Sequence, residues 1–377
     1  MTGRVALLGA GGFIGSRIVE MFHLGGLGDV RPIVRSVGAL ARLSRFDLEC
    51  QVADALDQRS LQAAFSDCDC VIHAIAGDPA TIRNSVAPVY RAAQLAGVRR
   101  IVYLSSASVH GQAPPAGTDE ESPVTPRQPL AYNGAKAWAE RRLLKLREKG
   151  SVEVVILRPG IVTGPRSIWQ TRFARDLLAG TACWLDDGRG ICNSLYVDNL
   201  VHAIHLALAA PAIDGMAFLL GDEETVTWAD LYGPVARALG FGSLDLPNVD
   251  YRPPPRNLRQ LVRALEANRS ARAIASLVPK RIRRGIFAAI EPLAPPGDST
   301  WAVPNAQHAP SPVATLEMSL LYRCSWKLPD TRARQRLGYR PVVSFAEGCR
   351  RTIGWLEFAG FPVIQENQRS RAPSVPA

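Results

Sequence analysis

The chain has 377 residues, of which 47% are apolar and 21% charged, and it carries a net charge of +10. These values indicate a globular protein with a sizeable core, long enough for one domain and a smaller second one. There is no run of about 18 apolar residues, so we expect no membrane-spanning helix. The first apolar run is soon interrupted by glycines, which argues against a secretory signal. Seven cysteines without framework spacing favour free thiols over disulfides or a metal site, and a reduced, cytoplasmic compartment.

Short apolar runs alternate with segments of helical spacing over most of the chain. The apolar runs predict strands at 5–8, 30–34, 71–75, 100–104, 152–157 and 217–220. Helical spacing predicts helices at 14–22, 60–65, 86–96, 131–149, 199–209, 228–239 and 345–358. Strands that alternate with helices pair in parallel. The predicted fold class is therefore α/β, a doubly wound parallel-sheet Rossmann domain with a smaller, mostly helical C-terminal substrate domain.

The domain boundaries follow from where this alternation becomes looser. We expect a Rossmann domain at 1–165 with a return segment near 193–222, a substrate domain made of 166–192 and 223–364, and a disordered tail at 365–377 rich in Ser, Arg and Pro.

A basic insertion bracketed by proline clusters is predicted at 243–312. Between 251 and 300 there are ten Arg or Lys and three Asp or Glu, so much of the positive charge of the chain is local. A local excess indicates a particular partner or substrate rather than general nucleic-acid binding. The stretch 279–293 is basic and amphipathic, which suits either a helix over the substrate cleft or contact with a membrane surface.

A glycine turn lies between the first predicted strand and the first predicted helix. Gly9 permits the tight turn, Gly12 lets backbone N–H groups approach a pyrophosphate, and Gly15 lets the helix pack closely on the sheet. Phe13 and Ile14 then open the helix, whose N-terminus attracts phosphate. The turn therefore predicts a dinucleotide site.

The residues after the second predicted strand bear on which dinucleotide is bound. A carboxylate that holds the adenosine ribose is expected about 20 residues beyond the turn. The sequence instead has Arg35 there, and a guanidinium suits a 2′-phosphate. NADP is therefore favoured over NAD. Asp54, after a third short strand, is the candidate contact for the adenine amino group.

Three side chains downstream of the turn predict acid–base chemistry. Tyr132 and Lys136 are four residues apart and share one face of a helix. A lysine ammonium beside the tyrosine, with a nicotinamide ring, is expected to lower the pKa of the phenol and make it a usable base. Ser106 follows the predicted strand 100–104, at the edge of the sheet where ligands of parallel sheets bind. Its hydroxyl is expected to reach the same substrate oxygen.

These motifs resemble those of the extended short-chain dehydrogenases/reductases, the NAD-dependent epimerase/dehydratase family, over about residues 3–240 and 313–360. The matching segments are Gly9-x-x-Gly12-x-x-Gly15, Val71-Ile-His-Ala74, Ser105-Ser-Ala-Ser-Val-x-Gly111, Tyr132-x-x-x-Lys136, Arg158-Pro-Gly-Ile-Val-Thr-Gly-Pro165 and Tyr196-Val-Asp-Asn-Leu200. The resemblance implies that Ser106 orients an oxygen, that Tyr132 is the acid/base and that Lys136 contacts the cofactor. It also implies that His73 and Ala74 line the cofactor and that Pro159 passes near the nicotinamide.

Two neighbours of Ser106 restrict the reaction that the resemblance implies. Dehydratases and decarboxylases of the family carry acidic residues where this chain has Ala107 and Ser108. What remains is epimerisation, or a net oxidation or reduction, at a carbinol or carbonyl carbon.

The leading hypothesis is an epimerase or oxidoreductase acting on a nucleotide-sugar, whose pyrophosphate would meet Arg166, Arg189 or Arg256. The first alternative is an NADP-dependent ketoreductase or hydroxysteroid-type dehydrogenase acting on an apolar substrate. A remote alternative is a non-catalytic protein that senses nucleotides or binds RNA, although no nucleic acid is expected. The sequence leaves open whether the protein forms a homodimer, and no metal ion is expected.

Overall fold

The computed structural model describes residues 3–241, 246–251, 312 and 314–364. Most of the predicted insertion at 243–312, with the stretch 279–293 and Arg256, lies outside the described residues, as does the tail at 365–377. No helix among the described residues is long and apolar enough to cross a membrane.

A seven-stranded parallel sheet forms the N-terminal part of the fold. In spatial order its strands are β10 (Ala217–Leu220), β6 (Glu153–Pro159), β5 (Arg100–Leu104), β4 (Cys70–His73), β1 (Val5–Leu8), β2 (Val30–Val34) and β3 (Gln51–Val52). The order runs outward from β1 in both directions, which is the doubly wound arrangement. The predicted α/β Rossmann fold is confirmed.

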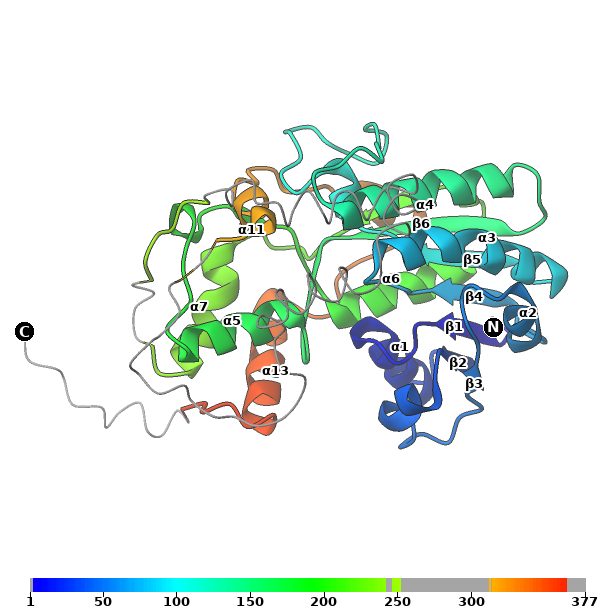
Figure 1. Ribbon diagram of the computed structural model, residues 1–377, viewed down its shortest axis with the longest axis horizontal. Coiled ribbons are helices and arrows are strands. Elements are labelled where there is room, and N and C mark those ends of the chain that lie inside the picture. The colour runs from blue at the N-terminus through cyan, green and yellow to red at the C-terminus, as the bar shows by residue number, and fades with distance from the viewer. Residues whose placement is uncertain (1–2, 242–245, 252–311, 313, 365–377) are drawn as a thin grey trace, which may run out of the picture.

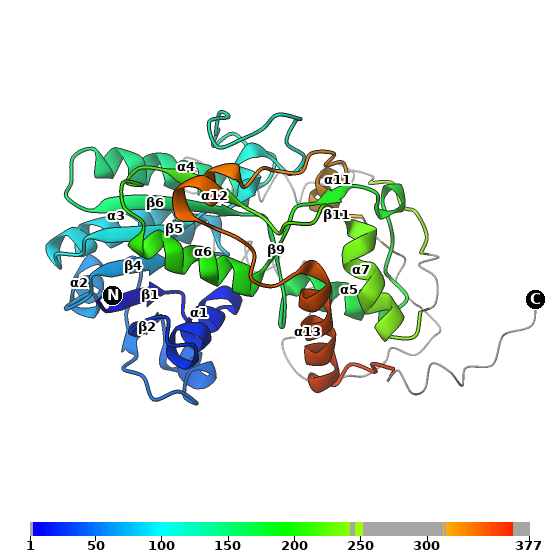
Figure 2. The same cartoon turned by 180° about the vertical axis from the view of Figure 1, so that it is seen from behind.

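Helices cover both faces of this sheet (Figures 1 and 2). One face carries α1 (Phe13–Leu24), α6 (Val197–Ala209) and α12 (Thr331–Leu337). The other carries α2 (Gln58–Ala64), α3 (Pro79–Leu95) and α4 (Ala131–Arg147). Because side chains alternate along a strand, Val5 and Leu7 pack toward the first group while Ala6 and Leu8 pack toward the second.

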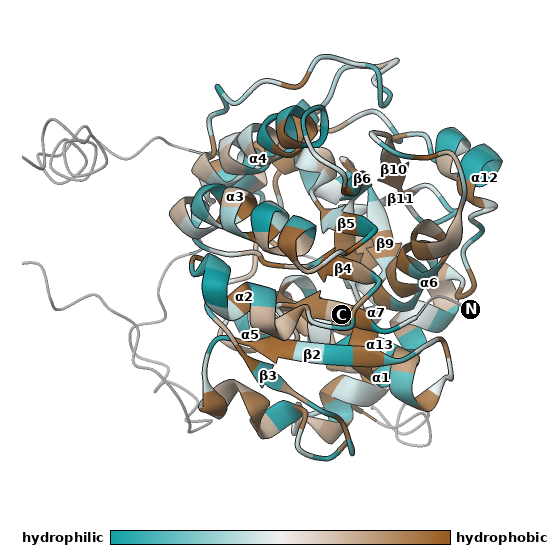
Figure 3. Cartoon of the chain, turned by 90° about the vertical axis from the view of Figure 1, so that its right-hand side faces the viewer, coloured by the Kyte–Doolittle hydropathy of each residue, from teal (hydrophilic) through white to brown (hydrophobic). Residues whose placement is uncertain are grey.

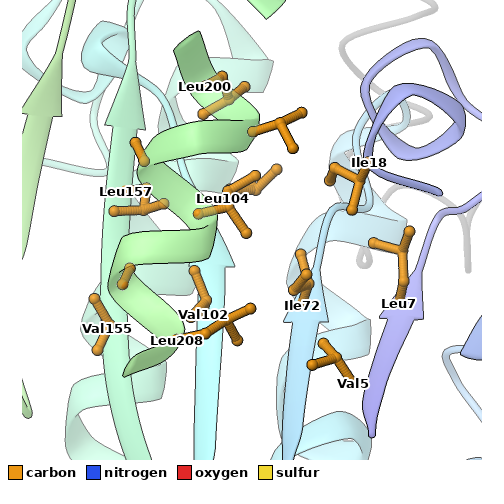
Figure 4. Close-up of a cluster of buried hydrophobic side chains, with 14 of the residues drawn as sticks. Val5, Leu7, Ile18, Ile72, Val102, Leu104, Val155, Leu157, Leu200 and Leu208 are labelled. Carbon is orange, nitrogen blue, oxygen red and sulfur yellow. The ribbon is translucent and has the colours of Figure 1, made fainter. Parts of the chain in front are cut away.

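The two resulting cores contain almost only apolar side chains. Figure 4 shows one of them, in which Leu7 and Ile72 of the strands meet Ile18 of α1, and Leu104 and Leu157 meet Leu200 of α6. Hydrophobic residues accordingly concentrate on the strands in the middle of the molecule (Figure 3). Apolar burial on both faces explains why these strands are continuous apolar runs in the sequence.

The rest of the described chain is partly helical and lies beside one end of the sheet (Figure 1). It contains α5 (Ile168–Leu178), α7 (Trp228–Ala238), α11 (Leu316–Leu321) and α13 (Phe345–Phe358). Two small sheets accompany them, β7 (Ile161–Thr163) with β9 (Ser194–Tyr196), and β8 (Ile191–Cys192) with β11 (Val226–Thr227). A third core of aromatic and aliphatic side chains holds this part together.

A buried ion pair fixes α4 to the sheet. Arg158, near the end of β6, donates to both carboxylate oxygens of Glu140, with Nη2 to Oε2 at 2.7 Å and Nε to Oε1 at 3.1 Å. The side chains are only 6% and 2% exposed. Such bidentate geometry offsets much of the cost of burying two charges and leaves one orientation of the helix favoured.

Candidate active site

The glycine turn adopts a geometry that larger residues would not allow. Gly9 has a φ of +85°, and a Cβ there would lie 2.9 Å from the carbonyl oxygen of Ala74. A Cβ on Gly15 would collide with the carbonyl oxygen of Gly9. Because Gly9 and Gly15 have no side chain, β1, the end of β4 and the start of α1 approach one another more closely than a residue with a Cβ would allow.

The turn leaves the N-terminus of α1 open toward a ligand. Gly12 is the N-cap of this helix and provides no side-chain cap, so the first N–H groups have no partner from that residue. Phe13 and Ile14 follow at the edge of the cavity described below. An open helix N-terminus next to a glycine turn fits a pyrophosphate, and the site therefore suits the dinucleotide expected from the sequence.

A basic side chain that the sequence analysis did not identify lies on this turn. Arg42, at the end of the short 3₁₀ helix Val37–Arg42, donates from Nη1 to the carbonyl oxygen of Gly11 at 3.0 Å. Arg35 is exposed directly after β2. Two guanidinium groups thus accompany the dinucleotide turn. The basic content of residues 35–45 was the sequence signal that could have indicated Arg42.

Two other predicted cofactor contacts lie at the same edge of the sheet. Asp54 is exposed after β3, where its Oδ1 accepts from the backbone N–H of Leu56 at 3.0 Å. His73, the last residue of β4, is fully buried. Its Nε2 lies 3.2 Å from Ser85 Oγ of α3, and burial lowers its pKa to about 3. The His73 side chain therefore contacts α3, whereas Ala74 lines the cavity, and the expectation that these two residues line the cofactor stays a prediction.

Ser106, Tyr132 and Lys136 line one cavity of about 670 Å³ together with Pro159. Ser106 precedes the 3₁₀ helix Ala107–His110, and its Oγ accepts from Ser108 Oγ at 2.8 Å. Tyr132 lies in the first turn of α4 and Lys136 one turn later. Ser106 follows β5, and Tyr132 and Lys136 belong to α4, so the three side chains lie at the carboxyl edge of the sheet. Figure 1 shows the positions of β5 and α4.

Lys136 is the most constrained of these side chains. It is 1% exposed, and Nζ donates to the carbonyl oxygens of Leu104 at 2.6 Å and Ile75 at 3.1 Å. Burial lowers its pKa to about 7, although the Glu140 carboxylate opposes this shift. An ammonium group has three donors, so one remains for a further acceptor such as a ribose hydroxyl.

Burial keeps Tyr132 protonated in the protein without cofactor. Burial, and secondarily the negative charge of Glu317, raise the pKa of its phenol to about 12. The lysine and a nicotinamide ring together were expected to lower this pKa, which stays a prediction for the complex, whereas Lys136 alone does not lower it. The reason is that Lys136 Nζ faces backbone carbonyls and lies 5.9 Å from the centre of the Tyr132 ring.

Aromatic side chains of the third core form an aromatic wall of the same cavity. It consists of Trp169, Phe173, Trp228, Tyr232 and Tyr322, all of which line the cavity. Phe173 stacks on Tyr232 with ring centres 4.1 Å apart, and Trp228 stacks on Tyr322 at 5.0 Å. Such rings present flat apolar surfaces, and stacking holds them in place.

The cavity also contains charged side chains that the sequence did not indicate. Glu317 of α11 and the pair Arg172–Asp176 of α5, with Nε and Oδ2 3.6 Å apart, line it. Glu317 lies far from the motifs along the chain, and Arg172 and Asp176 follow the segment Arg158–Pro165 without a pattern of their own. By contrast, Arg166 donates to Ser16 Oγ of α1, and Arg189 pairs with Asp187. Neither of these two arginines lines the cavity.

The pKa of Lys136 makes folding stability depend on pH. Its pKa is about 7 in the folded protein and near its ordinary 10.5 in the unfolded chain. Between these values the unfolded chain binds more protons, so the free energy of unfolding rises with pH. We expect wild type to gain stability relative to Lys136→Met from pH 7 to 9.5, measured by urea unfolding without cofactor. A difference between the two proteins that does not change with pH would contradict this.

The comparisons with known proteins agree with this geometry. The model of the NAD dependent epimerase/dehydratase family matches residues 5–221. A 2-alkyl-3-oxoalkanoate reductase of Shewanella oneidensis is 24% identical, over 91% of this chain and 84% of its own. A UDP-glucose 4-epimerase of Mycolicibacterium smegmatis is 31% identical, over 76% of this chain and 97% of its own. The structure of the epimerase Mth375 from Methanothermobacter thermautotrophicus superposes with a TM-score of 0.66 at 18% identity, covering 95% of this chain and 93% of that one. The chain is therefore an enzyme and belongs to the NAD-dependent epimerase/dehydratase family.

Proposed function

We propose that this enzyme is an NADP-dependent oxidoreductase that reduces an apolar ketone to the corresponding alcohol. The observation that carries the proposal is the aromatic wall of the cavity that Tyr132 also lines. A cavity lined by Trp169, Phe173 and Trp228 gains free energy by removing apolar substrate surface from water. It offers little to a diphosphate, which needs cationic partners.

The distribution of arginines supports an apolar substrate over a nucleotide-sugar. Arg166 and Arg189 were candidate pyrophosphate contacts, but their side chains are directed to Ser16 and Asp187. Arg172 is the one arginine among the described residues that line the cavity, and it faces Asp176. A single guanidinium with a carboxylate nearby is a weak site for two phosphate charges.

The protonated state of Tyr132 is the state from which a reduction starts. Its phenol, whose pKa is raised by burial, is protonated at neutral pH. It can therefore donate a hydrogen bond to a ketone oxygen and give up its proton as that oxygen becomes an alkoxide. An oxidation begins instead from the phenolate that this proton transfer leaves.

Each catalytic candidate then has a defined part in reduction. Ser106 Oγ donates to the ketone oxygen and fixes its position beside the Tyr132 hydroxyl. Lys136 would hold a ribose hydroxyl of the bound cofactor with its remaining donor. The nicotinamide cofactor supplies the hydride. Pro159, at the end of β6, lines the cavity where the ring would lie.

The preference for NADP rests on Arg35 and Arg42. Both follow β2 within one short segment, and Arg42 already contacts the glycine turn. A 2′-phosphate between two guanidinium groups forms charge-assisted hydrogen bonds that a ribose hydroxyl does not.

A nucleotide-sugar 4-epimerase is the second candidate. It is favoured by the 31% identity with the UDP-glucose 4-epimerase of Mycolicibacterium smegmatis. This function would require the cofactor to stay bound through a cycle of oxidation and reduction. It would also require cationic side chains in the cavity that bind the substrate diphosphate. Retention of the cofactor during turnover distinguishes the two functions.

The reduction itself can be tested with 2-decalone, a neutral bicyclic ketone, by following NADPH oxidation. We expect Tyr132→Phe to lower kcat by about 10²- to 10⁴-fold, because the proton donor is lost. Tyr90→Phe is the matched control, since Tyr90 of α3 is bonded to the backbone of Val152 away from the cavity. Full turnover by Tyr132→Phe, or no reduction of apolar ketones by wild type, would refute the proposed function.

The cofactor preference is tested by binding rather than turnover. In the double variant Arg35→Gln, Arg42→Gln we expect the Kd for NADPH to rise about tenfold or more, because charge-assisted hydrogen bonds are lost. The Kd for NADH should change by less than about threefold, since it has no 2′-phosphate. Arg45→Gln serves as the control, because Arg45 lies over the Phe46 ring and bonds to Glu20. Equal weakening of both cofactors would contradict the assignment.

A further inference from the structure

Arg166 lies on the first helix of the dinucleotide turn, although it belongs to the part of the chain beside the sheet. It follows β7, and its Nη1 donates to Ser16 Oγ of α1 at 3.1 Å. Ser16 closes the first turn of this helix, because its backbone N–H donates to the carbonyl oxygen of Gly12 at 2.9 Å. At the other end of the same segment Arg42 donates to the carbonyl oxygen of Gly11 at 3.0 Å. Guanidinium groups therefore contact both ends of the segment whose open N–H groups fit a pyrophosphate.

The arginines at this place outnumber the carboxylates that can pair with them. Glu20 of α1 is the carboxylate whose charge acts favourably on Arg166. It is already shared by Arg17 at 2.7 Å and Arg45 at 3.4 Å. Among the described residues, no carboxylate lies within ion-pair distance of Arg166 or Arg42. An anionic ligand is therefore the partner that these two side chains lack.

The surroundings of Arg166 disfavour an isolated positive charge. The side chain is half-buried, and burial, followed by the positive charges of Arg42 and Arg45, lowers the pKa of its guanidinium. Both contributions are unfavourable to the charged form. A negatively charged group bound beside Arg166 would offset them.

The backbone of Arg166 is strained. The turn from Gly164 to Ser167 is closed by the Ser167 N–H, which donates to the Gly164 carbonyl oxygen at 2.9 Å. Arg166 is the third residue of this turn and has a φ of +72°, where glycine or asparagine is favoured. Strain of this kind is commonly found where a side chain has a function. The conformation directs the guanidinium to α1 instead of the substrate cavity.

We propose that Arg166 binds the pyrophosphate of the cofactor, together with the N-terminal N–H groups of α1. A guanidinium has five donors, of which one is bonded to Ser16, so donors remain for two phosphate oxygens. The inference assigns Arg166 to the cofactor and not to a substrate diphosphate. It goes beyond the proposed reduction, since it depends only on the dinucleotide that the family binds.

This contact would connect cofactor binding to the wall of the substrate cavity. Ser167 follows Arg166 directly, is the N-cap of α5 and lines the cavity. Trp169 and Phe173 of the aromatic wall belong to the same helix. A pyrophosphate held by Arg166 would therefore also fix the start of α5.

The test measures binding of NADPH and NADH to the full chain by the fluorescence of the reduced nicotinamide. In Arg166→Gln we expect the Kd for both cofactors to rise about tenfold or more, because both lose a charge-assisted hydrogen bond. The ratio of the two Kd values should stay within about threefold of wild type, since both cofactors carry the same pyrophosphate. Arg189→Gln is the matched control, because Arg189 is exposed and pairs with Asp187, and it should change either Kd by less than about twofold.

A second variant separates binding from folding. Arg166→Gly also removes the guanidinium, but glycine is favoured at a φ of +72°. We expect it to unfold at a higher urea concentration than Arg166→Gln when no cofactor is present, and to bind NADH as weakly as Arg166→Gln does. Affinity and stability would then change in opposite directions.

Three results would overturn the inference. The first is an unchanged Kd for both cofactors in Arg166→Gln. The second is a loss confined to NADPH, which would place the guanidinium at the 2′-phosphate. The third is an equal loss in Arg189→Gln. Failure of wild type to reduce apolar ketones would refute the proposed function and leave this inference standing, whereas failure to bind either dinucleotide would refute both.

Discussion

The Lys136 ammonium group is held between the carbonyl oxygens of Leu104 and Ile75, and this contact fixes the active site. It ties the first half of α4 to the ends of β5 and β4. One turn earlier Tyr132 faces the cavity, and one turn later Glu140 pairs with Arg158 of β6. Three polar side chains at intervals of four residues therefore lie on one stripe of α4, directed at the sheet. The two hydrogen bonds of Lys136 and the ion pair of Glu140 together hold α4, and with it the Tyr132 phenol, in one position.

Burial sets the protonation states that this arrangement provides. The pKa of Lys136 falls to about 7 and that of Tyr132 rises to about 12 in the protein without cofactor. Desolvation disfavours the charged form of both groups, so the two shifts have one physical cause. The phenol is then a proton donor at neutral pH, which suits reduction. Both pKa shifts follow from burial, and in the proposed reduction the aromatic wall of the same cavity would bind the apolar part of the ketone.

The sequence was most informative where local geometry restricts the residue type. The glycine turn was predictable because Gly9 and Gly15 leave no room for a Cβ, and the buried strands because both their faces need apolar side chains. The family and the fold followed from these and from the motif around Tyr132. His73 illustrates the limit: the motif names a residue that ends a strand, whereas the direction of its side chain toward Ser85 is visible only in the fold.

Residues brought together only by tertiary structure could not be predicted in this way. Glu317 reaches the cavity from a helix almost two hundred residues beyond Tyr132, and its position depends on how α11 packs. Arg42 contacts the glycine turn through a short 3₁₀ helix that has no strong pattern. The raised pKa of Tyr132 likewise depends on burial, which spacing along one helix does not reveal.

The transfer of deuterium from NADPH labelled at the nicotinamide C4 tests the central claim most directly. The enzyme would be incubated with the labelled cofactor and an apolar ketone, and in parallel with UDP-glucose and NAD. Our account predicts deuterium on the carbinol carbon of the reduced ketone, release of NADP, and no change in UDP-glucose. Conversion of UDP-glucose to its 4-epimer with the cofactor retained, and no label in the ketone, would contradict it.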